Sequence, residues 1–435
     1  MRAPSPTHPL RPLVRHARRG TQQGVATLLV VMALFFLVSM VAAYTSRNLV
    51  FEQRTSANQY RATQAFEVAE AGVEWALALI NGGRIDATCR ATTDAAMGSY
   101  RGRYLAVDVD GGTVGPVRWT SPDFGPTALT PSCRRNAAGW TCHCPTNENP
   151  VLPDADGPGV SPAFRVQIQG TPTPGMFRLE ATACTNADDR CLRTAIGAGV
   201  EAAARVRAVV ALSPALAAPP AAAITARGDF AVGGTTPLRV VNEDAGTNGV
   251  TIRAGRFVTA PLTDLLVSAP GSLAEHSLVE DGGLAALGPE RFFYSLFGVS
   301  REAYPQLPTV VTFACGGGCG DRLRDAVAAN PGRPLWVTDA VVVDSDVQIG
   351  APGQPALIVA NGGAELAAGA RIAGVLYVQG NWTAVAGGTV DGAVVAEGQV
   401  SGTGMPDVRY DPAIVNRIRT TMGTVVRVPG GWRDF

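Results

Sequence analysis

The segment that most constrains this chain is a run of twenty uncharged residues, VATLLVVMALFFLVSMVAAY, from Val25 to Tyr44. At a rise of about 1.5 Å per residue, a helix of this length spans the roughly 30 Å hydrocarbon layer of a membrane. Five arginines and no acidic residue precede it. Because positive charge marks the cytoplasmic flank of a membrane helix, we expect residues 1–24 in the cytoplasm and the chain after Tyr44 outside.

The helix is predicted to continue well beyond the membrane segment. Between Thr45 and Ile80 the sequence has no Pro, a single Gly and many Ala, which favours a helix. Apolar residues recur at helical spacing along this stretch, so its second half is predicted to be amphipathic. Asn81 and the two glycines after it predict the end of the helix.

With its basic leader ending in Gly24, its apolar helix and the following RNLVFEQRTSANQYRATQAFEVAEAGVEWALA, the N-terminus resembles the N-terminal domain of PilX-type minor pilins of type IV pilus assembly. It is similar, less closely, to the atypical large pseudopilin of type II secretion. The resemblance implies cleavage by a prepilin peptidase between Gly24 and Val25 and methylation of the new N-terminus. It also implies partners, namely other minor and major pilins and the pilus assembly machinery of the inner membrane.

Two positions depart from the usual pilin pattern. Most pilins carry Glu at the fifth residue after the cleavage site and usually Phe at the first, whereas this chain has Leu29 and Val25. In pilins that Glu pairs with the N-terminal amine of a neighbouring subunit. Its absence argues against ordinary stacking in the middle of a filament and favours a place at or near the tip.

Charged residues of the predicted stalk are candidates for contacts between subunits. Three glutamates lie on adjacent turns, and like charges three or four residues apart in a helix repel each other by roughly 0.2–0.5 kcal/mol. They form either a solvated face or a surface that contacts arginines of a neighbouring subunit. The subunit-contact candidates are Leu29, Arg47, Arg54, Arg61, Glu67, Glu70 and Glu74. The plainer alternative for the whole segment is a single-pass signal anchor followed by a helical stalk.

The chain has eight cysteines, and an even number beyond a membrane anchor indicates disulfides formed in an oxidising compartment. Cys184 and Cys191 flank a short polar loop and are expected to pair. Cys315 and Cys319 close a loop of three glycines. The other four allow three pairings, among which the sequence does not choose: Cys89, Cys133, Cys142 and Cys144.

Composition and spacing exclude several chemistries. Every one of the 36 basic residues is Arg, which removes Schiff-base chemistry and the lysine of a P-loop. The 36 acidic residues balance them, which argues against nucleic-acid binding by bulk charge. The Cys142-His143-Cys144 run lacks zinc-ligand spacing, and Glu275-His276-Ser277 comes without a nucleophile elbow. We therefore expect no enzymatic activity, metal or cofactor.

An 18-residue repeat is present near the C-terminus. Val359, Tyr377 and Val395 align at this period, and Val341 extends the column one step back. A second column of glycines follows: Gly362, Gly380 and Gly398. Each repeat holds short strands that cannot bury an apolar face alone, so the repeats must stack. The pattern predicts a parallel β-solenoid of three to four coils, with an antiparallel sandwich as the alternative.

A helix is predicted after the repeats, with Asp411 as its N-cap and Pro412 in its first turn. The strand that follows, ending in VPGGWRDF, is expected to cover the open end of the solenoid. The terminal sequence and the Gly-rich repeats also resemble the C-terminal regions of large PilX-like proteins.

The predicted fold class is α+β, mostly β. Its parts are a basic leader at 1–24, a transmembrane pilin-like helix at 25–81, a β-rich disulfide domain at 84–212, an Ala/Pro linker at 213–223 and a β-solenoid domain at 224–435, with an insertion at about 235–334. We interpret the chain as a minor pilin or pseudopilin that spans the inner membrane once before assembly. It then reaches the pilus, the periplasm or the cell surface, where its large head could serve adhesion.

The alternative function is a membrane-anchored carbohydrate-binding or polysaccharide-active solenoid protein. Such a protein needs carboxylates or aromatic side chains gathered in one groove. The repeats offer Asp391, Glu365, Glu397 and Trp382, which are scattered in the repeat register.

Overall fold

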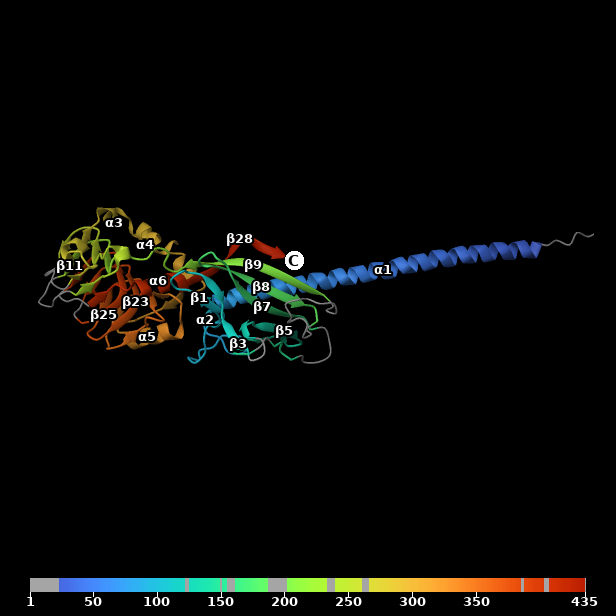
Figure 1. Cartoon of the computed structure of the whole chain (residues 1–435), viewed down its shortest axis with the longest axis horizontal. Coiled ribbons are helices and arrows are strands. Elements are labelled where there is room, and N and C mark those ends of the chain that lie inside the picture. The colour runs from blue at the N-terminus through green and yellow to red at the C-terminus, as the bar shows by residue number, and fades with distance from the viewer. Residues whose placement is uncertain are drawn as a thin grey trace, which may run out of the picture. The chain divides into compact units, whose positions relative to one another are not determined.

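The computed structural model describes residues 23–121, 125–148, 151–154, 161–186, 202–232, 239–259, 266–384, 387–402 and 407–434. The chain divides into two units, residues 1–60 and residues 61–435. Helix α1 (Gln23–Ile80) is continuous across this division, so its last turns belong to the second unit (Figure 1). The predicted long N-terminal helix is confirmed.

Helix α1 ends where the Asn81-Gly82-Gly83 sequence predicts, after Ile80. The Asn81 side chain then makes two hydrogen bonds to the backbone of Val425. Its Nδ2 donates to the Val425 carbonyl at 2.9 Å, and its Oδ1 accepts from the Val425 N–H at 2.8 Å. These buried bonds fasten the end of the helix to a strand 344 positions later in the sequence.

An antiparallel sheet packs against the last part of α1, from Ala65 to Ile80. Its strands are, in spatial order, β28 (Gly423–Asp434), β9 (Ala203–Pro214), β8 (Met176–Cys184), β7 (Ala163–Gly170), β5 (Ser132–Asn136) and β6 (Gly139–His143). Phe177, Leu179 and Val206 point from this sheet into a core shared with the helix. Gly72 permits the close approach, because a Cβ there would lie 2.9 Å from Cδ2 of Phe164.

Smaller elements precede this sheet in the chain. They are α2 (Tyr100–Tyr104), the antiparallel pair β1 (Leu105–Val107) and β2 (Val114–Pro116), and the antiparallel pair β3 (Arg118–Ser121) and β4 (Gly125–Ala128).

The C-terminal strand lies at a different place from the one that the sequence predicts. Strand β28 does not cover the end of the repeats; it pairs with β9, from Gly423 opposite Pro214 to Asp434 opposite Val206. Without β28, the twelve-residue strand β9 would expose an unpaired edge. Trp432 contacts α1 from this strand, since its ring centroid lies 5.8 Å from that of Phe66, although its side chain stays exposed.

The segment 213–223, which its composition indicates as a linker, is buried in part, while Ala217, Ala218 and Pro219 are exposed. Ser213 and Pro214 form the end of β9. Ala215 and Leu216 are buried and lie in one apolar cluster with Phe293 of helix α4 (Pro289–Phe297). The apolar residues Ala215 and Leu216 are therefore part of a core rather than of a free linker.

Two parallel sheets form most of the remaining chain. The first contains β10 (Ile224–Ala226), β12 (Val240–Val241), β13 (Ile252–Ala254), β15 (Leu266–Val267), β16 (Leu278–Glu280), β17 (Val311–Phe313), β18 (Leu335–Val337), β20 (Gln348–Ile349), β21 (Ala356–Ala360), β23 (Arg371–Val378), β25 (Thr389–Ala396) and β27 (Asp407–Arg409). The second contains β11 (Phe230–Val232), β14 (Val258–Thr259), β19 (Val341–Val343), β22 (Ala364–Leu366), β24 (Trp382–Ala384) and β26 (Val400–Gly402).

The 18-residue register is present in these sheets. In the ladder β21-β23-β25, Tyr377 lies opposite both Val359 and Val395. The Gly398 N–H donates to the Gly380 carbonyl at 3.0 Å, so these two glycines occupy equivalent turns of neighbouring repeats. Parallel pairing of successive repeats is the arrangement that the sequence predicts, and the antiparallel alternative is wrong for this region.

The extension of the repeat back to Val341 is wrong. Val341 pairs with Ala364 in the second sheet, whereas Val359 pairs with Trp336 in the first. Both pairs are separated by 23 positions rather than 18. The longer repeat contains an additional tight turn in which Ala351 and Gln354 form a bridge.

Strands also arise within residues 235–334, the expected insertion. Strand β13 pairs in parallel with β10, and β10 pairs in parallel with β25. Strand β10, which precedes this region, therefore lies between β13 and the last 18-residue repeat, while β17 and β18 lie at the other end of the ladder. The stacking order in space differs from the order along the chain.

Helices cover the face of the first parallel sheet that points away from the second. Phe293 of α4 and Ile414 of α6 (Pro412–Thr421) pack in one cluster with Val375 and Tyr377. Asp411 caps α6 as predicted, since its side chain accepts from the N–H groups of Ala413 and Ile414. The described residues also contain the helices α3 (Gly282–Ala286) and α5 (Gly320–Ala329) and the short 3-10 helices η2 (Ala245–Thr247), η3 (Ala274–Ser277) and η4 (Tyr304–Gln306).

Candidate assembly interface

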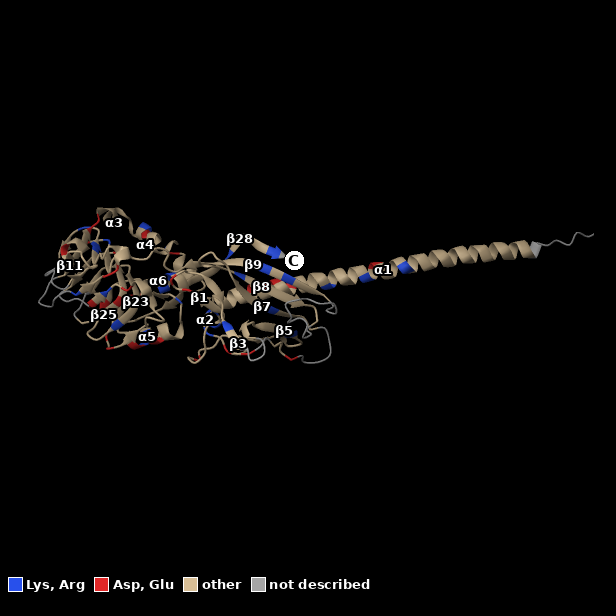
Figure 2. Ribbon diagram, in the orientation of Figure 1, with Lys and Arg blue, Asp and Glu red and all other residues tan. Residues whose placement is uncertain are grey.

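The first part of α1 presents apolar side chains to its surroundings. No charged residue occurs between Gln23 and Ser46, as Figure 2 shows along the helix. Val25 is 64% exposed and Leu29 is 63% exposed. The helix is long and apolar enough to cross a membrane. Apolar exposure on this scale requires a lipid or protein environment, because water is a poor solvent for such a surface.

Gly24 lies in the first turn of α1, directly before the apolar residues, while residues 1–22 lie outside the described part of the chain. The expected cleavage after Gly24 would therefore leave α1 intact from Val25 onward. Such a cut would place the new amine at the start of the helix, four residues before Leu29.

The arginine candidates on α1 are exposed, and within the described residues Arg47, Arg54 and Arg61 make no ion pair. Glu67 is exposed as well, and Glu70 is half-buried. The suggested contact of these charges with a neighbouring subunit stays a prediction.

Glu74 has a partner within its own chain. Its Oε1 forms an ion pair with Nη2 of Arg427 in β28. The sequence did not predict a role for Arg427, because nothing in the local sequence indicates that β28 returns to the helix. The pair adds to the contact between α1 and the C-terminal strand.

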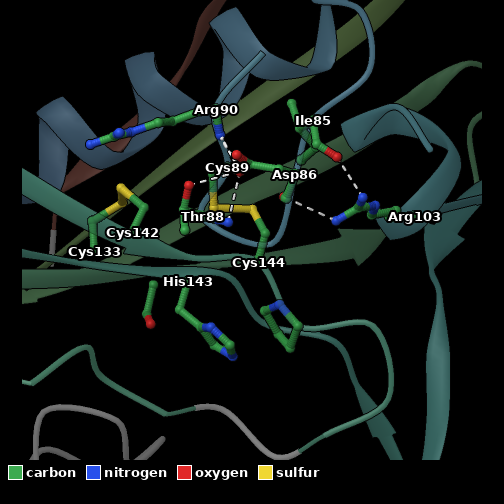
Figure 3. Close-up of a disulfide and its surroundings, with 12 residues drawn as sticks. Ile85, Asp86, Thr88, Cys89, Arg90, Arg103, Cys133, Cys142, His143 and Cys144 are labelled. Carbon is green, nitrogen blue, oxygen red and sulfur yellow. Dashed lines mark hydrogen bonds between the residues drawn. A yellow bond between two sulfur atoms is a disulfide. The ribbon is translucent and has the colours of Figure 1, made fainter. Parts of the chain in front are cut away.

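The structure selects one pairing among the four cysteines left open by the sequence. Cys89 is bonded to Cys144, and Cys133 is bonded to Cys142 across strands β5 and β6 (Figure 3). Cys315 is bonded to Cys319. Cys184 is buried at the end of β8. Its expected partner, Cys191, lies outside the described residues, so this pairing stays a prediction.

The loop that carries Cys89 is organised by Asp86. The Asp86 carboxylate accepts hydrogen bonds from the N–H groups of Arg90 and Thr88 and from the Thr88 hydroxyl (Figure 3). These bonds, the one from Arg90 first, lower the pKa of the Asp86 carboxyl below its usual value. Asp86 thus holds Cys89 in its left-handed backbone conformation, with φ of 64°.

The residues considered for metal binding and hydrolysis have other roles. Cys133, Cys142 and Cys144 are all in disulfides, so they supply no thiolate. His143 Nε2 lies 2.7 Å from Oε1 of Glu148. In the part of the chain that the structure describes, no group of three His, Cys, Asp or Glu side chains is arranged to hold a metal ion.

The Glu275-His276-Ser277 run forms the short helical turn η3. The Ser277 hydroxyl donates to the Ala274 carbonyl at 2.6 Å and lies 2.7 Å from the Thr251 hydroxyl. Ser277 is buried. The Ser277 hydroxyl is therefore hydrogen-bonded inside the fold and has a structural role.

The carboxylates and the tryptophan considered for a polysaccharide site do not form a groove. Trp382 is fully buried in the core between the parallel sheets. Glu397 is 3% exposed and pairs with Arg301, which donates from Nη1 to its Oε2 at 3.1 Å. Glu365 is exposed and Asp391 is half-buried. No local pattern in the sequence indicates Arg301, which lies 96 positions from its partner.

Comparison with known proteins identifies the N-terminal segment. Residues 23–74 match the family model described as PilX N-terminal. This segment is PilX-like. The match confirms the resemblance seen in the sequence, and it covers most of helix α1 and none of the sheets.

Two further comparisons add little. No curated protein matches the chain. Among solved structures, the crystal structure of the competence-associated pilin ComZ from Thermus thermophilus aligns over 86% of this chain and 97% of that chain, with 11% identity and a TM-score of 0.23. A similarity this low carries no argument about the sheets of this chain.

Proposed function

We propose that this chain is a minor pilin or pseudopilin with a structural, non-enzymatic role. It is inserted in the inner membrane through α1, is processed by prepilin peptidase and joins a type IV pilus or a related filament. There it primes or caps assembly and displays a large extracytoplasmic head that serves adhesion. The PilX match over an exposed apolar helix is the observation that carries this proposal.

We further propose that the two parallel sheets are walls of a β-solenoid, as the 18-residue register supports. In this proposal the head has a disulfide domain at 84–212 and a solenoid domain after residue 223. Strand β28 belongs to the disulfide domain, because it pairs with β9. The partners are other minor and major pilins and the inner-membrane assembly machinery.

Processing after Gly24 is the first test. In cells with active prepilin peptidase, N-terminal sequencing of the membrane-extracted protein should start at Val25. The variant Gly24→Val should keep its leader, because a branched side chain replaces the glycine at the cleavage site. Gly20→Val is the matched control in the same leader and should be processed normally. A wild-type chain that retains residue 1 in such cells would contradict the proposal.

The position in the filament follows from Leu29. A buried N-terminal ammonium without a carboxylate partner costs typically several kcal/mol, about 3–5 when a pair is broken. The wild-type chain should therefore label the ends of sheared pili in immunogold microscopy, and Leu29→Glu should shift label along the shaft. Leu29→Ala, which adds no carboxylate, should keep the label at the ends. Even labelling of wild-type shafts at major-pilin density would rule out the tip position.

A further inference from the structure

A cavity of about 430 Å³ opens on one face of the antiparallel sheet, at strands β8, β9 and β28. Side chains alternate between the two faces of a strand, and Phe177, Leu179 and Val210 point toward α1. Arg178 and Val209, which lie opposite each other in the β8-β9 ladder, therefore point to the other face and line the cavity. Its volume is within the roughly 300–1,000 Å³ of ligand pockets.

The cavity is produced by a bulge in β28. Arg427 lies opposite Val210 and Trp432 lies opposite Ala208, so residues 428–431 have only Val209 to oppose. Gly430 has a φ of +74°, and a Cβ on Gly431 would lie 2.8 Å from the Cβ of Val209. Glycines at these two positions let the strand loop out and still lie close to β9.

Three arginines of three strands, Arg178, Arg207 and Arg433, surround this cavity, on a sheet where Figure 2 shows several basic residues. Arg433 lies opposite Arg207, and Arg207 lies opposite Glu180. The Arg207 guanidinium forms an ion pair with the Glu180 carboxylate. Arg178 and Arg433 are exposed, and among the described residues neither makes an ion pair or a side-chain hydrogen bond.

The other walls of the cavity are apolar and include Met176, Val209 and Val428. A ligand that fits this combination carries a carboxylate for the guanidinium groups and an apolar part for the walls. Arginine can bind a carboxylate through a planar fork of N–H donors. In the same sheet, Nε of Arg207 donates to Oε2 of Glu180. A small inorganic anion would leave the apolar walls in water.

An extended peptide fits the surroundings of the cavity. Strand β28 is the last strand of its sheet, and its outer edge is not paired with any other described strand. Such an edge can hydrogen-bond an added strand, whose side chains then alternate in direction. We propose that the cavity binds an acidic side chain of an extended polypeptide segment from a partner protein, with Arg178 and Arg433 as the residues that hold the carboxylate.

Peptide binding to the full-length protein in detergent tests this proposal independently of pilus assembly. The probe is a fluorescently labelled, capped peptide of alternating valine and glutamate, and its counterpart has glutamine in place of glutamate. We expect saturable binding of the glutamate peptide, at least about tenfold tighter than the glutamine peptide, which corresponds to 1.4 kcal/mol. The variant R178Q/R433Q should lose at least about tenfold in affinity.

The matched control is R371Q, since Arg371 is an exposed arginine of β23 without a side-chain partner in the described residues. It should bind the glutamate peptide as the wild type does, and all variants should show the same thermal midpoint. Equal binding of both peptides, or an R178Q/R433Q variant that binds like the wild type, would overturn the proposal. So would tighter binding of a uronic-acid oligosaccharide that displaces the peptide, because the ligand would then be a glycan.

Discussion

Replacing Gly392 by alanine is expected to destabilise the parallel sheets by about 3–5 kcal/mol, through backbone strain and steric overlap together. Gly392 is buried in β25 with a φ of +135°, a conformation that L side chains rarely adopt. A Cβ at this position would lie 2.0 Å from the carbonyl oxygen of Gly374 in the neighbouring strand. That oxygen belongs to the backbone, so it cannot move without breaking the ladder between β23 and β25.

Urea-induced unfolding of the full-length protein in detergent, followed by tryptophan fluorescence, measures this effect. Gly353→Ala is the matched control, because Gly353 is exposed and a Cβ there meets no atom within 4 Å. The control should change the free energy of unfolding by less than about 0.5 kcal/mol. If Gly392→Ala unfolded at the same urea concentration as the control, the close stacking of the repeats would be refuted.

Replacing Arg301 by alanine is expected to cost about 3–5 kcal/mol at neutral pH, because it leaves the buried Glu397 carboxylate without its partner. Arg301 donates to Glu397 Oε2 at 3.1 Å and contacts Oε1 as well. The other polar groups around Glu397 are Arg227, which donates to its backbone carbonyl at 2.8 Å, and the buried Tyr377. Glu290 lies on the far side of Arg301, with 3.1 Å between its Oε1 and Nε of Arg301.

The loss should depend on pH. Burial raises the pKa of Glu397 above its usual value, and Arg301 opposes that increase. Between the unfolded pKa and the higher folded pKa the folded protein binds more protons, so its stability falls as the pH rises through this window. Without Arg301 the folded pKa is higher still, and the window extends further upward. The variant should therefore approach the wild-type free energy of unfolding in acid and diverge from it toward neutral pH.

The double variant Arg301→Met/Glu397→Leu is the control for this prediction. It removes both charges and keeps apolar bulk, so it should recover most of the lost stability and show no pH dependence from this site. A loss in Arg301→Ala that is the same at acid and neutral pH would show that the effect comes from packing of the arginine side chain alone.

The features that the sequence predicted depend on neighbouring residues or on a regular period. The end of α1 at Asn81, the cap of α6 at Asp411 and the pairing of Tyr377 with Val359 and Val395 are of this kind. Each follows from local backbone preferences or from the spacing of apolar residues. The 18-residue period does not extend to Val341, because an extra turn lengthens that repeat. The spacing of apolar residues does not indicate this turn.

The features that the sequence did not predict join distant residues. The pairing of β28 with β9, the ion pair of Arg427 with Glu74 and that of Arg301 with Glu397 each depend on how the whole chain returns on itself. The arginine-lined cavity has the same origin, since it exists only where a C-terminal bulge meets β8 and β9. No local pattern predicts these long-range contacts, because in the sequence each partner alone resembles an ordinary surface residue.

Because Gly423 pairs with Pro214, residues 215–422 form an insertion between two neighbouring strands of the antiparallel sheet. The chain leaves the antiparallel sheet at the end of β9 and re-enters it at the start of β28, and these two positions lie directly opposite each other. A tight hairpin of a few residues could join these two strands equally well. The helix and its antiparallel sheet are therefore topologically complete without the parallel sheets.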